Sequence, residues 1–162
     1  MENLPEIEDV RIVEEILTSM GADISRTPDG SMRIDPSGIS TFSVTGEMVS
    51  SMRASYYLLG ALLGRYKKAE IALPGGCAIG QRPIDQHIKG MRALGADIVI
   101  QGGSVKARAD RLRGAEIYLD VVSVGATINI MLAAVAAEGQ TIIANAAKEP
   151  HVVDVANFLN MM

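Results

Sequence analysis

The sequence predicts an α/β fold in which helices pack inside short sheets, built from repeated units, more than a doubly wound parallel sheet. Three observations support this. The run Gly-Ala-Asp-Ile occurs at 21–24 and again at 95–98, and the run from Ser51 resembles the run from Ser123. Each Gly-Ala-Asp-Ile closes an amphipathic helix and precedes a hairpin pattern. Each unit also contains a second helix that is apolar on nearly all sides, and such a helix is buried.

The first unit begins with an amphipathic helix that ends at Gly21, a typical helix C-terminal residue. Its apolar positions recur at helical spacing, and they are Val10, Val13, Ile16, Leu17 and Met20. A hairpin over 24–26 and 31–34 follows, around the turn residues 28–30. A short strand, a buried helix and a strand over 69–73 complete the unit. The buried helix carries Leu58, Leu59, Leu62 and Leu63.

The second unit repeats this order of elements. Its amphipathic helix ends at Gly95 and has apolar positions at Ile84, Ile88, Met91 and Leu94. A hairpin over 97–101 and 104–108 flanks the tight turn 102–103. A short strand, a second buried helix and a strand over 141–144 follow. That helix carries Ile128, Ile130, Met131, Leu132 and Val135.

A third unit starts at Pro150, with apolar positions at Val152, Val153, Val155, Phe158, Leu159 and Met162. The pattern next calls for a helix cap and a hairpin, so we expect a piece of a longer protein. Residues 1–162 then form one partial domain, with units at about 5–75 and 79–149 and a truncated third. Apolar surface left uncovered by the incomplete unit could drive self-association.

The composition excludes several classes of protein. The chain has 162 residues, about one domain, and its net charge of −4 provides no basic field for nucleic acid. Aromatic residues make up only 4%, too few for base-stacking platforms. A single cysteine forms no internal disulfide, which fits a reducing compartment. The longest apolar run, 130–137, is well short of the ~20 residues of a membrane span. We therefore expect a cytoplasmic protein.

The only cysteine, Cys77, lies in the run Pro-Gly-Gly-Cys-Ala-Ile-Gly-Gln-Arg-Pro at 74–83. The glycines and prolines of this run predict a loop. A thiol on such a loop, just ahead of Arg82, is better placed for chemistry than for packing. Free cysteines are also often small buried apolar residues, and spacing alone leaves this alternative open.

Three places could bind anions. The first is the helix start at Pro83, where exposed backbone N–H groups attract anions and Arg82 adds a positive charge. The second is the predicted N-cap Ser123, because Gly125 lets a ligand approach the backbone closely. The third is Arg53, since an arginine in a buried helix needs an anionic partner. The alternatives are a solvent-facing Arg82, an ordinary capped helix, and a structural carboxylate beside Arg53.

Other polar residues carry weaker signals. Asp85 suits the positive end of the helix dipole and could do only that. His87 is two positions further on, so it does not share a helix face with Asp85 and a catalytic dyad is not expected. The two histidines, His87 and His151, do not have the spacing of metal ligands.

Four stretches together resemble the bacterial UDP-N-acetylglucosamine enolpyruvyl transferases (UDP-N-acetylglucosamine 1-carboxyvinyltransferases). The loop run 74–83 is the most specific of them, and the resemblance covers essentially the whole chain. The stretches are Met-Arg-Ala-Ser at 52–55, residues 74–83 with Asp85 and His87, Ser-Val-Gly-Ala-Thr at 123–127, and Asn-Ala-Ala-Lys-Glu-Pro at 145–150.

The resemblance implies a fold and site residues. The fold is an inside-out α/β barrel of the enolpyruvyl transferase type, with helices inside short sheets. Cys77 is implied as the catalytic cysteine that protonates the enolpyruvyl methylene and that fosfomycin alkylates. Arg53 and Arg82 are implied to hold the phosphate of phosphoenolpyruvate. The residues implied to grip the UDP-sugar are Arg82, Pro83, Ile84, Asp85, Gln86, Ser123, Val124 and Gly125.

The implied reaction transfers the enolpyruvyl group from phosphoenolpyruvate to the 3-hydroxyl of UDP-N-acetylglucosamine, the first committed step of peptidoglycan synthesis. No metal or organic cofactor is implied. The family's Lys-Asn pair, its aspartate base and a further arginine have no counterpart here. We therefore expect no turnover without the missing second domain of the same enzyme.

Three other hypotheses remain open. The chain could be a non-catalytic module that binds nucleotide-sugar or phosphate. It could belong to the shikimate-pathway enolpyruvyl transferases, although that family lacks the reactive loop cysteine. Finally, it could be a structural domain whose glycines only make turns, which requires a buried Cys77.

Overall fold

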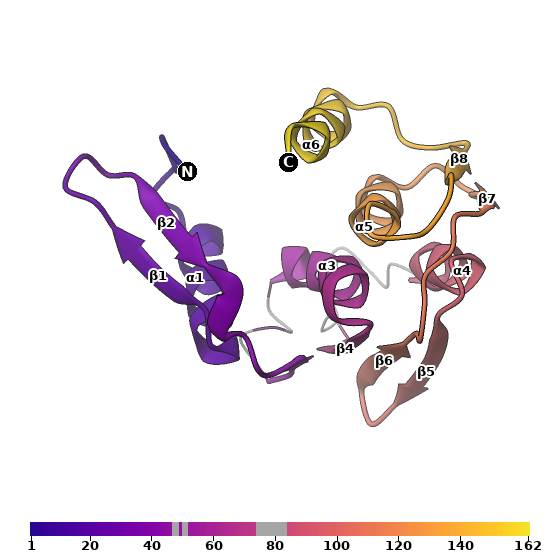
Figure 1. Ribbon diagram of the computed structural model, residues 1–162, viewed down its shortest axis with the longest axis horizontal. Coiled ribbons are helices and arrows are strands. Elements are labelled where there is room, and N and C mark those ends of the chain that lie inside the picture. The colour runs from indigo at the N-terminus through magenta and orange to yellow at the C-terminus, as the bar shows by residue number, and fades with distance from the viewer. Residues whose placement is uncertain (47–48, 50–51, 74–83) are drawn as a thin grey trace.

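The computed structural model describes residues 1–162 except 47–48, 50–51 and 74–83, and it leaves the side chain of Arg53 undescribed. Helices and short strands alternate along the chain (Figure 1). The first elements are α1 (Glu8–Met20), β1 (Asp23–Arg26), β2 (Met32–Asp35), η1 (Pro36–Gly38), β3 (Ser43–Val44), η2 (Arg53–Tyr56), α3 (Tyr57–Tyr66) and β4 (Lys68–Ala72). The others are α4 (Asp85–Ala93), β5 (Asp97–Gln101), β6 (Ser104–Arg108), β7 (Glu116–Tyr118), α5 (Val124–Ala134), β8 (Ile142–Ala144) and α6 (Pro150–Met161).

The strands form three small sheets, which confirms both predicted hairpins. In the described part of the chain, β1 and β2 pair antiparallel as a sheet of their own. The second hairpin, β5–β6, joins β4 and β3 in a four-stranded sheet of order β3-β4-β6-β5. The short strands β7 and β8 pair in parallel. Most pairings are antiparallel, so the fold is not a doubly wound parallel sheet.

The three helices α3, α4 and α5 pack together, with α5 in contact with both others and the hairpins outside (Figure 1). Leu59 and Leu63 of α3 and Ile130 of α5 are fully buried, as the apolar pattern predicted. The four-stranded sheet contributes apolar residues to the same core, such as Val105 of β6 and Ile71 of β4. Helices packed inside short sheets are therefore confirmed as the architecture.

Glycines set the close approach of the inner helices. A Cβ atom built on Gly60 of α3 would lie 2.1 Å from the backbone oxygen of Asn129, and one on Gly64 would lie 2.8 Å from that of Leu132. A Cβ on Gly90 of α4 would lie 2.2 Å from a side-chain carbon of Ile130. The contacts of α3 progress in the same direction along both helices, and so do those of α4, where His87 lies beside Gly125 and Gly90 beside Ile130; α3 and α4 therefore run parallel to α5.

The first amphipathic helix ends as the sequence predicted. Gly21 adopts a left-handed conformation with φ of 107°, and its N–H bonds back to the carbonyl oxygens of the last turn of α1. Ile16 and Met20 are the residues of α1 that are buried. The apolar stripe of α1 therefore faces the core.

The C-terminal helix leaves most of its apolar positions partly or fully exposed. Of its apolar positions only Val152 is buried, while Val153 and Phe158 are 50% exposed and Met162 is 87% exposed. The physical reason is that α6 packs chiefly against α5 in the described part of the chain. Val135, expected in a buried helix, is 59% exposed because it lies just past the end of α5.

An apolar groove runs between α5, β8 and α6. Its volume is about 300 Å³, and its lining includes Met131, Ile143 and Leu159.

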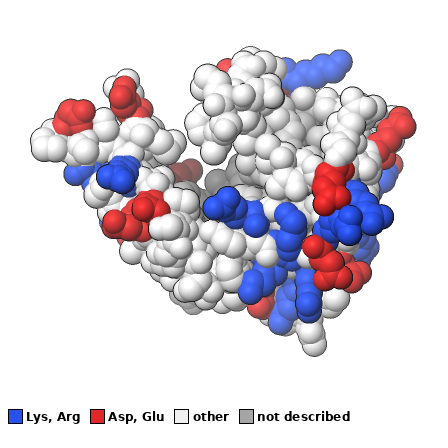
Figure 2. Space-filling view, viewed as in Figure 1, with Lys and Arg blue, Asp and Glu red and all other residues white. Residues whose placement is uncertain are grey.

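In Figure 2 few charged side chains lie over α6, whereas Lys and Arg gather over α4 and the four-stranded sheet. None of the helices in the described segments is long and apolar enough to cross a membrane.

Candidate functional site

The starts of three helices meet at one end of the inner bundle. Tyr56 precedes α3, His87 lies in the first turn of α4, and Gly125 lies in the first turn of α5. The rings of Tyr56 and His87 are in edge-to-face contact with centroids 5.1 Å apart. A Cβ atom on Gly125 would lie 3.3 Å from Cε1 of His87. Since the helices run parallel, the positive ends of their dipoles point the same way.

Asn129 of α5 connects these three starts through a buried polar network. Its side chain has no exposed surface. Its Oδ1 accepts from the backbone N–H of Gly60 at 2.6 Å, and its Nδ2 donates to the carbonyl oxygen of Tyr56 at 3.0 Å. The same Nδ2 lies 3.0 Å from Nδ1 of His87. One amide thus joins α5 to the starts of both α3 and α4.

The backbone partners of Asn129 fix the protonation of His87. The N–H of Gly60 requires an acceptor and the carbonyl of Tyr56 requires a donor, so the orientation of the Asn129 amide is settled. Its Nδ2 must therefore donate to His87 Nδ1, which carries no proton. The remaining proton of the neutral ring lies on Nε2, and that atom is one of the two ring atoms near Gly125.

Tyr56 provides a buried phenol in the same place. Only 4% of the residue is exposed, and in the described part of the chain its hydroxyl has no hydrogen-bond partner. Burial raises the pKa of Tyr56 far above its ordinary value, so the phenol stays neutral. It is available as a hydrogen-bond donor rather than as a base.

The start of α5 is capped by side chains, as the sequence predicted. Oγ of Ser123 accepts from the backbone N–H of Ala126 at 3.3 Å. The hydroxyl of buried Thr127 donates to the carbonyl oxygen of Ser123 at 2.7 Å and accepts from the N–H of Ala147 at 3.1 Å. The first turn of α5 is thereby also tied to the segment that follows β8.

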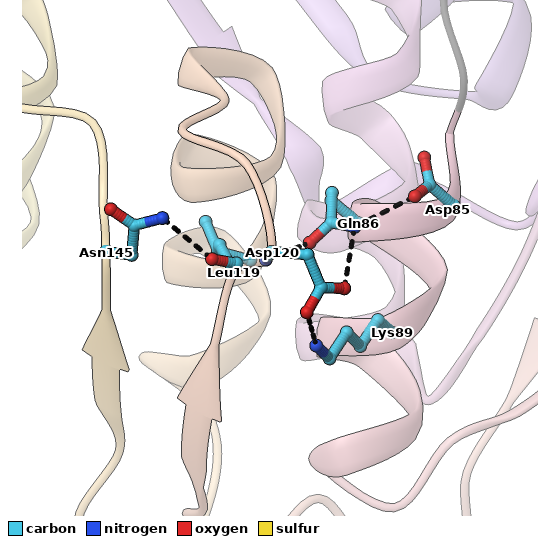
Figure 3. A network of polar contacts seen from close by, with 6 residues as sticks. All are labelled: Asp85, Gln86, Lys89, Leu119, Asp120 and Asn145. Carbon is cyan, nitrogen blue, oxygen red and sulfur yellow. Dashed lines mark hydrogen bonds and ion pairs between the residues drawn. The ribbon is translucent and has the colours of Figure 1, made fainter.

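The start of α4 is joined to the loop before α5 through Gln86 (Figure 3). The backbone N–H of Asp120 donates to Oε1 of Gln86 at 2.9 Å. Nε2 of Gln86 donates to Asp85 at 2.8 Å and to the carboxylate of Asp120 at 3.1 Å. Hydrogen bonds from Lys89 and Gln86 lower the pKa of Asp120, which therefore stays ionised at neutral pH.

Asn145 contacts the same loop from the opposite side (Figure 3). Its Nδ2 donates to the carbonyl oxygen of Leu119 at 2.8 Å, and its backbone has φ of 55°. Asparagine tolerates this left-handed conformation better than most residues. The N–H of Leu119 bonds to the carbonyl oxygen of Ala144 at 3.1 Å, which continues the pairing of β7 with β8.

The structure brings two of the predicted groups of site residues together. The starts of α4 and α5 are neighbours, because Gly125 lies beside the ring of His87 and Gln86 bonds Asp120 just before α5, and the predicted residues lie on these two starts. Those residues are Ile84, Asp85, Gln86, Ser123, Val124 and Gly125. Gln86 differs from the others because it is buried and both ends of its amide are already bonded.

The other predicted site residues are described incompletely or not at all. Arg53 is the first residue of η2, which leads into α3, but its side chain lies outside the description. Cys77, Arg82 and Pro83 lie outside the described residues. Their roles remain predictions from the sequence.

Several residues of this region had no role in the sequence analysis. Asn129 stands between Ile128 and Ile130 in an otherwise apolar helix, and a polar residue there is the signal that could have revealed it. Asn145 lies in a stretch noted only for its resemblance. Tyr56 and Asp120 offer no comparable signal, because their importance depends on contacts far apart in sequence.

This arrangement suits the binding of an anion. Free N–H groups and dipole ends favour negative charge at a helix start, and here two starts lie side by side. Gly125 has no side chain, and this allows the ring of His87 to lie beside the first turn of α5. Among the described residues, no group of three or more His, Cys, Asp or Glu side chains could hold a metal ion.

Comparisons with known proteins identify relatives along the entire chain. The family model described as EPSP synthase (3-phosphoshikimate 1-carboxyvinyltransferase) matches residues 1–162. A protein of Clostridium botulinum named UDP-N-acetylglucosamine 1-carboxyvinyltransferase is 59% identical over 100% of this chain and 39% of its own length. One of Bacillus subtilis, UDP-N-acetylglucosamine 1-carboxyvinyltransferase 2, is 56% identical, with 100% and 38% covered. The chain thus spans well under half the length of these relatives.

Solved structures give the same fold. The enolpyruvyl transferase NikO from Streptomyces tendae matches with a TM-score of 0.82 at 24% identity, over 98% of this chain and 38% of its own. The EPSP synthase from Acinetobacter baumannii matches with a TM-score of 0.70 at 25% identity, over 93% and 35%. The predicted fold class is confirmed by these neighbours.

Proposed function

The chain belongs to the EPSP synthase (3-phosphoshikimate 1-carboxyvinyltransferase) family, and from this membership we propose that it is part of a UDP-N-acetylglucosamine enolpyruvyl transferase. The proposed enzyme transfers the enolpyruvyl group of phosphoenolpyruvate to the 3-hydroxyl of UDP-N-acetylglucosamine. This reaction starts peptidoglycan synthesis, which we place in the cytoplasm. The observation that carries the proposal is the paired starts of α4 and α5, which place two positive helix ends side by side.

The proposed substrate is inferred from the names of the most similar relatives and from their sequence identity to this chain. Proteins named for UDP-N-acetylglucosamine are 55–59% identical to this chain over 98–100% of its length. The EPSP synthase with a solved structure is only 25% identical. The loop cysteine Cys77 also favours a UDP-N-acetylglucosamine enzyme, because the shikimate-pathway family lacks a reactive cysteine in this loop. A nucleotide-sugar is therefore favoured over a phosphorylated shikimate.

The residues divide into three proposed roles. The diphosphate of the nucleotide-sugar would lie at the first turn of α5, from Ser123 to Gly125, and against residues 82–86 at the start of α4. Arg53 and Arg82 would hold the phosphate of phosphoenolpyruvate. Cys77, as a thiol, would donate its proton to the methylene carbon of phosphoenolpyruvate while the 3-hydroxyl oxygen of the sugar, losing its own proton, bonds to the neighbouring carbon. Loss of phosphate from that carbon and of a proton from the new methyl group would then restore the double bond. No metal or organic cofactor takes part in this scheme.

The chain by itself is proposed to bind rather than to turn over substrate. It covers 37–39% of the length of its curated relatives, so a second domain would close the site. A non-catalytic module that binds nucleotide-sugar or phosphate is the second candidate function, favoured by the same helix starts. Division of residues 1–162 into units at about 5–75, 79–149 and from 150 onward is likewise proposed.

Mass spectrometry of the intact chain after incubation with fosfomycin tests the enzymatic proposal. Cys77 is expected to gain one fosfomycin, and Cys77→Ser is expected to gain nothing. Calorimetric titration with UDP-N-acetylglucosamine distinguishes the binding module from the enzyme. Binding of the nucleotide-sugar without any labelling of Cys77 supports the binding module. Absence of both labelling and binding would contradict both functions.

A further inference from the structure

We propose that Gln86 and Asn145 are positioning residues that clamp one peptide unit between them and so set the orientation of the first turn of α5. This inference rests on the proposed function, because that turn is where the nucleotide-sugar diphosphate would bind. Neither residue then needs to touch the ligand through its side chain. The resemblance implied that Gln86 contacts the substrate and implied no role for Asn145.

Gln86 has little left to offer a ligand. Only 5% of the residue is exposed. A glutamine amide has two N–H donors, and Nε2 of Gln86 already bonds the carboxylates of Asp85 and Asp120. Its Oε1 accepts the backbone N–H of Asp120 at 2.9 Å. The side chain therefore serves the loop before α5.

Asn145 acts on the other side of the same loop. Its Nδ2 donates to the carbonyl oxygen of Leu119 at 2.8 Å. Figure 3 shows Asn145 and Gln86 on opposite sides of the segment formed by Leu119 and Asp120. The two side chains come from the connection after β8 and from the start of α4, which are far apart in sequence.

The two contacts fall on one peptide unit. The carbonyl oxygen of Leu119 and the N–H of Asp120 belong to the same planar group, so holding both fixes the tilt of that plane. Only two residues separate Asp120 from the N-cap Ser123. The orientation of this peptide therefore decides how the chain enters α5 and where its free N–H groups point.

An ion pair nearby provides a control for the clamp. Lys89 contacts Asp120 at 2.7 Å, but the two side chains are 42% and 60% exposed. Exposed pairs of this kind contribute little, so Lys89→Met removes a charge contact to the same residue without releasing the peptide. A change in amide exchange or ligand affinity that occurs in the Gln86 variants but not in Lys89→Met is therefore due to loss of the clamp.

The test uses the intact chain with three variants beside Lys89→Met. Gln86→Leu removes both ends of the amide. Asn145→Asp replaces the donor by an acceptor in a residue that keeps the left-handed backbone. Gln86→Glu keeps the acceptor for the N–H of Asp120 but places an ionisable carboxyl group where the amide was.

The variant Gln86→Glu makes the clamp depend on pH. The introduced carboxyl group lies beside the carboxylates of Asp85 and Asp120, which raise its pKa. Lys89 bonds the other oxygen of Asp120 and offsets this effect only in part. Once protonated, the introduced group again donates one hydrogen bond and accepts another, so this variant should regain the clamp at about pH 5.

Amide hydrogen exchange, followed by NMR, measures the protection that the clamp gives to nearby backbone amides, and it needs no ligand. We expect the amides of Asp120 and Thr127 to exchange about tenfold faster in Gln86→Leu and Asn145→Asp, since each variant loses a part-buried hydrogen bond to the Leu119–Asp120 peptide. The amide of Val105 in β6 serves as the reference for global stability and should not change. In Gln86→Glu, the Asp120 amide should slow again on acidification, after correction for the intrinsic pH dependence of exchange.

Titration with UDP-N-acetylglucosamine measures the effect of the clamp on ligand affinity. Affinity should fall about tenfold in Gln86→Leu and Asn145→Asp and stay within about twofold in Lys89→Met. Unchanged exchange at Asp120 and Thr127, or unchanged affinity in variants of a chain that binds, would overturn the inference. If the unaltered chain does not bind the nucleotide-sugar, the proposed function fails for this chain, and the exchange rates still decide whether the clamp exists.

Discussion

The stretches 8–72 and 85–144 have the same order of elements but begin their inner helices differently. In the first stretch, α3 is entered through the short helix η2, and among the described residues its N-cap, Tyr56, makes no side-chain capping hydrogen bond. In the second stretch, α5 begins at Ser123, whose side chain caps the helix. Gln86, Asn145 and Thr127 then hold the segment around that start.

The difference also extends to the amphipathic helices. The buried residues of α1 are Ile16 and Met20, which are apolar. Helix α4 buries Gln86 and His87 as well, and both of them bond to groups in or just before α5. Both stretches thus contain closely packed glycines, but the buried polar side chains of the amphipathic and inner helices, such as Gln86, His87 and Asn129, belong to the second stretch. The candidate site lies where the polar contacts are.

Replacing Asn129 by alanine should have the largest effect, because it joins the two stretches. The change removes hydrogen bonds to Gly60, Tyr56 and His87 in a fully buried place. We expect the free energy of unfolding to fall by about 3 kcal/mol in urea denaturation. Asn157→Ala on exposed α6 is the matched control, with a change within about 0.5 kcal/mol. Equal effects of the two variants would contradict the network.

Replacing Gly60 by alanine comes next and tests the glycine packing of α3. The added Cβ would lie 2.1 Å from the backbone oxygen of Asn129, so the helices must separate. We expect a loss of about 2 kcal/mol in the free energy of unfolding, even though alanine favours helix. In Gly125→Ala the nearest contact is 3.3 Å, with the ring of His87, and stability should change far less. A Gly60→Ala protein as stable as the original would refute the packing argument.

Removing the cap of α5 should cost less. Ser123→Ala deletes the oxygen that accepts from the N–H of Ala126, and thermal unfolding should report a loss of about 1 kcal/mol. Ser25→Ala, at an exposed position of β1, should leave the free energy of unfolding nearly unchanged. If the two substitutions change the free energy of unfolding equally, the side chain of Ser123 does not stabilise the start of α5.

The smallest expected effects concern two carboxylates, one in each stretch. Hydrogen bonds lower the pKa of Asp35 through Ser37 and that of Asp120 through Lys89 and then Gln86. Both aspartates therefore stabilise the fold above their ordinary pKa of 3.8, and this contribution is lost as pH falls through the lowered value. Carbon NMR titration should show Lys89→Met raising the pKa of Asp120 alone. An ordinary pKa for Asp120 in the unaltered chain would contradict the contacts drawn for it.

Much of the fold could be predicted because local patterns determine it. The Gly102-Gly103 turn and the alternation around it indicated β5 and β6, and the apolar run indicated α5. The exposure of Phe158 could not be predicted, because helical spacing tells which residues share a face but not what covers that face. The neighbouring starts of α4 and α5 were expected only by resemblance. The clamp on the Leu119–Asp120 peptide depends on contacts between distant segments, which no local pattern encodes.

The most direct test of the account is backbone amide NMR of the chain during titration with UDP-N-acetylglucosamine. The account predicts shifts concentrated at Val124, Gly125 and Ala126 and at Asp85 to His87, while α1 and the β1–β2 hairpin stay unchanged. Shifts confined to the first stretch, or none at saturating ligand, would contradict a nucleotide-sugar site at the paired helix starts.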